Sequence, residues 1–301
     1  MKLSNVLVLP IAVLLISVNL SAQKTKPKPS PKPSPIIFAV LNDGKMVEPL
    51  AYVVGGKLTQ PVSGGEDPAR LLSFNRTYYK VNTSYRLIFG GANAGTVTVK
   101  NSDPKAECSA NMAEISTVST RAKLKGNVMA LASNVAATKK GSGVRRLPTA
   151  DERAQVEDLV RREFTKHKAP SKTLRSHNLT ALDVDSDGVA ELVGTYWVDS
   201  SAASRALLFF IADRGAGGKY SFGFIDFRNI KQEDVMSGDM ADVDSGVYHE
   251  RLLDVFDYDN DGVAEVFTYI QSFEGAGFDA YRREAGKWTK IFEGSNYHCG
   301  Y

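Results

Sequence analysis

The sequence predicts a mainly β protein, with antiparallel four-stranded, blade-like meanders of the β-propeller kind, an N-terminal β domain and one connecting helix. Three observations support this fold class: apolar runs broken by Gly- and Asn-containing turns, an acidic segment that recurs at an offset of 74 residues, and a single helical period. The 301 residues are 43% hydrophobic and 24% charged. This composition excludes wholesale disorder and a multi-span membrane protein.

Residues 1–22 have the pattern of an export signal peptide. Lys2 supplies a positive start, Val6 to Val18 form an apolar run, and Ala22 offers a small residue before the cleavage point. The run has about 13 residues, whereas a membrane-spanning helix needs ~20. We therefore expect a cleaved leader and a secreted, periplasmic or cell-surface protein, without a membrane span after cleavage. The alternative is an uncleaved anchor.

Residues 23–35 form a predicted linker, KTKPKPSPKPSP in its main part. Alternating proline favours an extended polyproline conformation, which suits a spacer; the alternative is electrostatic docking on an anionic envelope. Five of the 37 basic residues lie in the first 35 positions, so the rest of the chain holds 32 basic and 34 acidic residues. This balance predicts no nucleic-acid partner.

Residues 36–145 are predicted to form the N-terminal β domain. Ile36 to Leu41 is an apolar run that ends at the turn Asn42-Asp43-Gly44, which predicts a hairpin because Asn and Gly tolerate positive φ. Tyr85 to Phe89, a Gly-Gly break and Gly95 to Val99 predict a second hairpin. No helical apolar period is evident in this part, so strands alone are expected.

Residues 146–170 are predicted to contain the connecting helix. Thr149 and Glu152 have the spacing of a capping box. Apolar residues then recur at helical spacing up to Phe164, and Pro170 ends the segment. We expect this helix to join two β regions.

The two cysteines are Cys108 and Cys299. In an exported protein an even number of cysteines favours a disulfide bond, and the alternative is two buried thiols. No Cys-x-x-Cys or His-x-x-x-His spacing occurs, so a zinc site is not predicted.

Residues 171–301 contain an internal repeat of two units. The pattern D-x-D-x-D-G-x-x-E occurs at residues 183–191 and again at 257–265, each time between segments rich in β-branched and aromatic residues. A Gly-Lys-aromatic turn follows in each unit, at Lys219-Tyr220 and Lys287-Trp288. Each unit therefore reads as a four-stranded antiparallel meander.

The acidic segments have the chemistry of calcium loops. Ca²⁺ takes six to eight oxygen ligands, and glycine at position 6 allows a sharp turn. Without a cation, four carboxylates in nine residues repel one another; the alternative reading is a solvated acidic hairpin. An EF-hand is excluded, because position 12 is Gly194 in one unit and Thr268 in the other, where a bidentate glutamate is needed.

Both units resemble FG-GAP or VCBS-type repeats, the calcium-binding blades of integrin-α-like propellers, over about residues 175–295. The resemblance implies two Ca²⁺ sites in hairpins between the first two strands of each blade. The implied ligands, with the valines acting through their carbonyl groups, are Asp183, Asp185, Asp187, Val189 and Glu191 in the first loop and Asp257, Asp259, Asp261, Val263 and Glu265 in the second.

Motifs of catalysis are missing from the sequence: we find no G-x-S-x-G, H-E-x-x-H, P-loop or dinucleotide fingerprint. Asp239, Asp242 and Asp244 are weighed as a degenerate third loop, but their spacing is broken. His177 and His249 are interpreted as structural.

The expected function is a non-enzymatic binding or adhesion module for a protein or glycan. The competing hypothesis is a secreted hydrolase with calcium as a structural ion.

Overall fold

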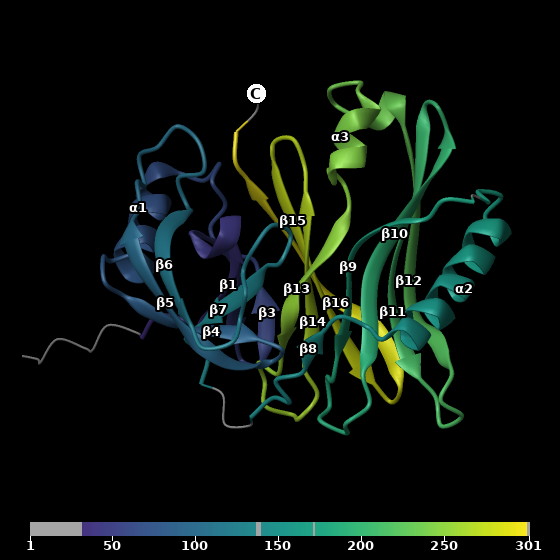
Figure 1. Cartoon of the computed structure of the whole chain (residues 1–301). Coiled ribbons are helices and arrows are strands. Elements are labelled where there is room, and N and C mark those ends of the chain that lie inside the picture. The colour runs from purple at the N-terminus through teal and green to yellow at the C-terminus, as the bar shows by residue number, and fades with distance from the viewer. Residues whose placement is uncertain (1–31, 137–139, 171, 300–301) are drawn as a thin grey trace, which may run out of the picture. The chain divides into compact units, whose positions relative to one another are not determined.

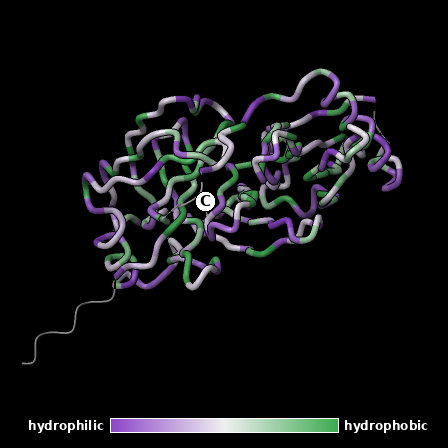
Figure 2. The backbone as a smooth tube through the Cα atoms, turned by 90° about the horizontal axis from the view of Figure 1, so that it is seen from below, coloured by the Kyte–Doolittle hydropathy of each residue, from purple (hydrophilic) through white to green (hydrophobic). Residues whose placement is uncertain are grey.

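Antiparallel strands dominate the computed structural model, as the sequence predicted (Figure 1). The structure describes residues 32–136, 140–170 and 172–299. The predicted signal peptide and most of the predicted linker lie outside these residues. Pro33–Tyr301 is one compact unit that contains three sheets. Figure 2 shows hydrophobic stretches along its inner strands and hydrophilic stretches at the outer loops.

The N-terminal sheet has the strand order β1-β7-β4-β5-β6-β2-β3, and an additional β1–β2 pairing closes six of these strands into a barrel-like ring. The hairpins predicted at residues 42–44 and 90–91 are confirmed by the β1–β2 and β4–β5 pairings. The strands are β1 (Ile36–Leu41), β2 (Met46–Val54), β3 (Lys57–Thr59), β4 (Ser84–Phe89), β5 (Ala92–Asn101), β6 (Ala113–Ser119) and β7 (Ala130–Ser133), with a 3-10 turn at Asn42–Gly44.

The expectation of strands alone in this domain is wrong, because helix α1 (Pro68–Tyr78) packs against the barrel. Asp67 caps the helix by accepting from the backbone N–H of Ala69 at 2.8 Å. Only three side chains of α1 are buried, at Leu71, Phe74 and Tyr78. Three buried apolar residues in eleven give only a weak helical period in the sequence.

The two predicted meanders are present as separate sheets. The first has the order β12-β11-β10-β9, extended by β8, and the second has the order β13-β14-β15-β16. The strands are β8 (Arg145–Arg146), β9 (Arg175–Leu182), β10 (Glu191–Ser201), β11 (Ser204–Arg214), β12 (Tyr220–Lys231), β13 (Glu250–Phe256), β14 (Glu265–Gln271), β15 (Gly275–Glu284) and β16 (Lys287–Tyr297).

Helix α2 (Ala150–Lys166) begins with the predicted capping box. The hydroxyl of Thr149 accepts from Glu152 N, and the Glu152 carboxylate accepts from Thr149 N at 2.7 Å. The helix does more than connect two β regions, since its apolar side packs on the outer face of the first meander through Val156, Val160 and Phe164. A 3-10 turn (Gln232–Asp234) and helix α3 (Met240–Ser245) link the two meanders.

The elements stack in four layers, in the order barrel, second meander, first meander, α2 (Figure 1). One face of the second meander packs on the outside of the barrel, with Phe267 and Phe278 against Ile37 and Leu131. Its other face packs on the first meander. These layers bury the ends of the first two strands that adjoin each acidic loop, and so they fix the loops that join those strands.

The predicted disulfide is confirmed: Cys108 and Cys299 are bonded, with their Cα atoms 5.1 Å apart. Beside this bond, the ring of His298 binds the fully buried carboxylate of Glu48 at 2.7 Å. The end of the chain is thereby attached to the barrel. In the parts of the chain that the structure describes, no helix has the length and apolar character needed to cross a membrane.

Candidate metal centre

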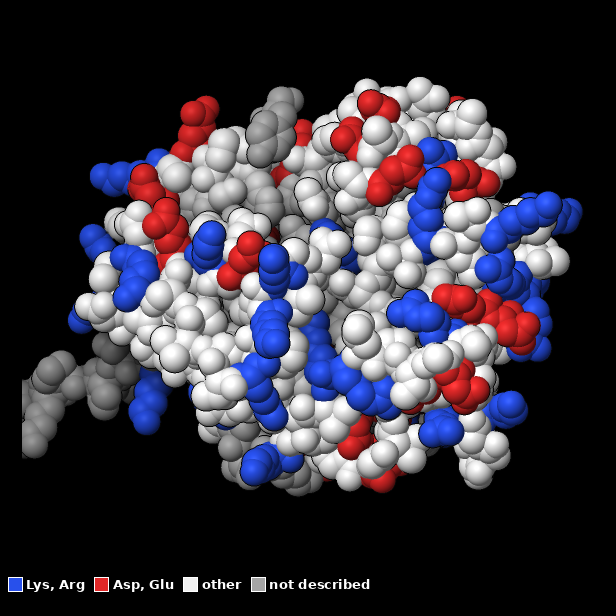
Figure 3. All heavy atoms as spheres, in the orientation of Figure 1, with Lys and Arg blue, Asp and Glu red and all other residues white. Residues whose placement is uncertain are grey.

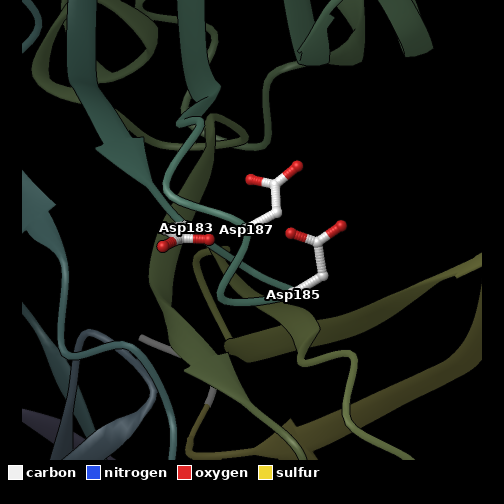
Figure 4. Close-up of side chains that lie close together, drawn as sticks. All are labelled: Asp183, Asp185 and Asp187. Carbon is white, nitrogen blue, oxygen red and sulfur yellow. The ribbon is translucent and has the colours of Figure 1, made fainter.

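Each acidic loop joins the first two strands of its meander, where the sequence pattern placed it. The first loop (residues 183–190) runs from β9 to β10, and the second (257–264) runs from β13 to β14. In each loop, carboxylate oxygens of the three aspartates lie within 4.8 Å of one another. Figure 4 shows the side chains of the first loop, with the carboxylates of Asp185 and Asp187 side by side.

The two loops fold in the same way because their polar side chains bind their own backbone. The N–H of the position 6 glycine donates to the first aspartate, from Gly188 to Asp183 at 3.3 Å and from Gly262 to Asp257 at 3.0 Å. Positions 4 and 6 have positive φ in both loops, for example 82° at Gly188. Glycine at position 6 adopts this conformation without strain.

Two buried carboxylate oxygens in each loop have no hydrogen-bond partner. They are Asp183 Oδ1 and Asp185 Oδ1 in the first loop, and Asp257 Oδ1 and Glu265 Oε2 in the second. An anionic oxygen that is both buried and unpaired is costly, and a bound cation removes that cost. The residues present therefore fit a hard divalent cation, which prefers oxygen ligands.

The carboxylates at positions 3 and 9 of each loop bind an arginine of β15. Arg283 contacts Asp185 and also Glu191, the latter at 3.0 Å. Arg282 contacts Asp259 and also Glu265, the latter at 2.8 Å. The two arginines are consecutive in the strand, so their side chains point to opposite faces of the sheet.

Burial disfavours the charged form of these carboxylates. Burial raises the pKa of Glu191 to about 7, although Arg283 acts in the opposite direction. Burial likewise raises the pKa of Glu265 to about 8, against the effect of Arg282. The pKa values of Asp183 and Asp257 are also raised, first by burial. One arginine per loop thus offsets only part of the cost of the buried negative charge.

The two loops touch each other directly. The N–H of Ala264 donates to the carbonyl oxygen of Val184 at 2.7 Å. Beside this contact lies a cavity of about 320 Å³, lined by Asp183 and Asp257 of the loops and by Gly91 and Ser142 from outside them. The first aspartates of both loops thus border one cavity.

The structure brings together, within each loop, the residues expected as ligands. Sequence reasoning missed Arg282, Arg283 and Asp213, a carboxylate of β11 that also binds Arg283. The sequence offers one signal for these arginines: they are adjacent in a predicted strand of the repeat. Since side chains alternate along a strand, adjacent arginines point to opposite faces of the sheet.

The third calcium loop considered from the sequence is not formed. Its aspartates belong to helix α3 or cap it. Asp239 caps that helix by accepting from Ala241 N, and Asp244 is paired with Arg205. His177 and His249 pack around Trp197, with ring centroids 4.3 and 4.7 Å from that of the indole. This packing agrees with a structural role for both histidines.

Charges of both signs occur on the face shown in Figure 3, where a row of basic side chains crosses the middle and acidic side chains lie towards the edges.

Comparison of the chain with protein-family models, with curated proteins and with solved structures returned no match. The residues themselves therefore carry the functional argument.

Proposed function

We propose that this is an exported calcium-binding β-repeat protein of the FG-GAP or VCBS type. In this proposal the two meanders are blade-like units and each acidic loop holds one Ca²⁺. The observation that carries it is the pair of unpartnered, buried carboxylate oxygens in each loop, one of them on the first aspartate, which the backbone N–H of the position 6 glycine holds in place. Face-to-face packing of the two meanders also supports the blade reading, since neighbouring propeller blades pack in this way.

The ion acts as a structural element in this proposal. It balances carboxylates that burial has made costly, and it holds the hairpins between β9 and β10 and between β13 and β14. The chain's own residues orient the site: the glycine N–H groups fix the first aspartates, and the loop backbone fixes the third. The protein itself is then a non-enzymatic module that binds a protein or glycan outside the cell, with its fold stapled by the Cys108–Cys299 bond.

Calorimetric titration of the chelated protein with Ca²⁺ tests the metal sites. A ligand selective for the native state stabilises it by about 2.7 kcal/mol when present at 100 times its Kd. We expect binding heat at millimolar calcium and a rise in the melting temperature. Asp185→Ala and Asp259→Ala should each abolish one site and reduce the rise in melting temperature that calcium produces.

Magnesium is the matched control, because it demands a smaller octahedral shell and should substitute poorly. No binding heat, together with an unmoved melting temperature on chelation, would contradict the proposal. A screen of the purified protein against polysaccharides and peptides tests the second part. Saturable binding without turnover supports a binding module, and turnover contradicts it.

A further inference from the structure

The arginine contacts occupy oxygens that a bound cation needs. In the first loop both oxygens of Glu191 are engaged, one by Arg283 and the other by the N–H of Val184 at 3.1 Å. In the second loop both oxygens of Asp259 are engaged, by Arg282 and by the N–H of Asp261. If all the expected ligands of a loop are to bind Ca²⁺, which takes six to eight oxygen ligands, Arg283 must release Glu191 and Arg282 must release Asp259.

Each arginine also has a second set of partners close at hand. Arg283 lies 3.3 Å from Asp213, and its guanidinium carbon is 6.0 Å from the centre of the Trp288 ring. The indole N–H of Trp288 holds that same Asp213 carboxylate in place at 3.0 Å. An arginine that leaves the first loop thus keeps a charged partner and an aromatic face.

Arg282 has the corresponding arrangement on the opposite face of β15. It donates to the hydroxyl of Tyr258 at 3.0 Å and lies 3.8 Å from the carboxylate of Glu284. Glu284 is largely exposed and is not one of the loop carboxylates. Both arginines can therefore move without leaving a charge buried and unpaired, which would be strongly unfavourable.

We propose that Arg282 and Arg283 are internal counter-cations, which neutralise part of the negative charge of the loops in the calcium-free protein and exchange with Ca²⁺ at Asp259 and Glu265 and at Asp185 and Glu191. This inference rests on the proposed function and adds the regulation of its sites. Each arginine stabilises the calcium-free loop and, for the same reason, weakens calcium binding. Both sites are thereby held in the weak range, on the order of 0.1–1 mM, that is typical of extracellular modules.

The exchange differs between the two loops in one respect. Arg282 and its loop belong to the same meander, whereas Arg283 reaches from the second meander to the first. Release of Asp185 and Glu191 by Arg283 therefore removes two ion pairs that join the meanders and leaves the pair with Asp213. Calcium at the first loop is coupled to the contact between the two sheets.

Calorimetric titrations of Arg283→Gln and Arg282→Gln test the exchange. Each variant loses one cation next to one loop, so we expect one of the two calcium sites to tighten about tenfold or more. The melting temperature of the chelated variant should fall, and the rise on adding calcium should exceed that of the wild type.

Arg205→Gln is the matched control, because it also removes a partly buried arginine from two carboxylates. Arg205 pairs with Asp244 at 2.7 Å and Asp199 at 2.9 Å, near the hairpin at the start of β11. This variant should melt at a lower temperature with both calcium affinities unchanged. Equal gains in affinity for all three variants would mean that net charge alone acts, and this would overturn the inference.

Suppose that the wild type binds calcium. Calcium affinities that are unchanged or weaker in both Arg282→Gln and Arg283→Gln would then likewise overturn the proposed exchange. Absence of binding in the wild type is a different result, which refutes the proposed function itself. If a glutamine variant does not fold, Arg283→Lys replaces it: lysine keeps the charge but lacks the fork that bridges two carboxylates. Tightening of one site is expected there too, and an unchanged affinity contradicts the exchange.

Discussion

The backbone N–H of Ala264 donates to the carbonyl oxygen of Val184, and this one hydrogen bond joins the two acidic loops. Its acceptor lies between two expected ligands of the first loop, and its donor lies between two of the second. Ordering one loop therefore holds part of the other in place, which lowers the conformational cost of the second binding event.

We predict positive coupling between the two sites on this basis. Asp257→Asn should abolish the second site and weaken calcium binding at the first by a few-fold, and Asp183→Asn should weaken the second by the same factor, because coupling free energy is reciprocal. Calorimetry on both variants measures the two factors. Equal affinities of the remaining site in wild type and variant would show that the loops are independent.

The buried ion pair between Arg145 and Asp254 should be essential for stability. Its two side chains are 5% and 0% exposed and lie 3.3 Å apart, and Asp254 also accepts from the N–H of Gly90 in the barrel. Asp254→Asn leaves a buried guanidinium without its counter-charge, which should cost about 3–5 kcal/mol of unfolding free energy.

Denaturant unfolding of Asp254→Asn measures this loss, with the exposed pair of Arg162 and Asp158 as the control. Asp158→Asn should change the free energy of unfolding by less than about 1 kcal/mol. The double variant Arg145→Met with Asp254→Asn should lose less than the sum of the single variants. Simple additivity of the two changes would contradict a direct interaction.

The Cys108–Cys299 bond should contribute about 2–4 kcal/mol to stability, because it restricts the unfolded chain over a separation of 191 residues. The double variant Cys108→Ser with Cys299→Ser should melt at a lower temperature than the wild type, and reductant should lower the wild type to the same value. Non-reducing peptide mapping should recover both cysteine peptides as one species. Two separately alkylated cysteines, or identical melting with and without reductant, would refute this role.

Acid should destabilise the protein through the buried His249 and the half-buried His177. Burial lowers the pKa of His249 to about 3 and that of His177 to about 4, and the nearby charge of Arg251 lowers both further. The charges of His177 and Arg228 also lower the pKa of His249, while Asp244 raises it. Each ring is neutral in the folded protein and takes up a proton first in the unfolded chain, whose histidine pKa is about 6.5.

This contribution to stability is complete above pH 6.5 and is lost as the pH falls towards the folded pKa values. At pH 4 the loss from His249 alone should reach about 3 kcal/mol. Denaturant unfolding between pH 7 and pH 4 measures it, with His249→Phe as the comparison. The variant should lose less stability over this range, and parallel curves would refute the assignment.

The repeat made the second half of the fold predictable. Two acidic segments in register, each followed by a Gly-Lys-aromatic turn, placed both meanders and both loops correctly, because hairpin formation depends on neighbouring residues. The capping box at Thr149 located helix α2 for the same reason.

Long-range pairings could not be predicted in this way. Closure of the barrel requires β1 to pair with β7, and Phe38 lies opposite Ala132 in this pairing. No pattern in the neighbouring sequence predicts which distant strand will pair with β1. The contact of Arg283 with Asp185 spans 98 residues and depends on how two sheets pack. The candidate ligands therefore followed from the sequence, whereas their counter-cations required the structure.

The layer order also bears on how this chain acquires its structure. The second meander follows both the barrel and the first meander in the sequence, yet it is packed between them. Until β13 to β16 are in place, the outer face of the barrel around Ile37 and Leu131 and the inner face of the first meander around Phe209 have no apolar cover. Such pairings between distant segments make folding slow. Partly folded chains consequently expose two apolar surfaces at once. They can aggregate through these surfaces until β13 to β16 have folded.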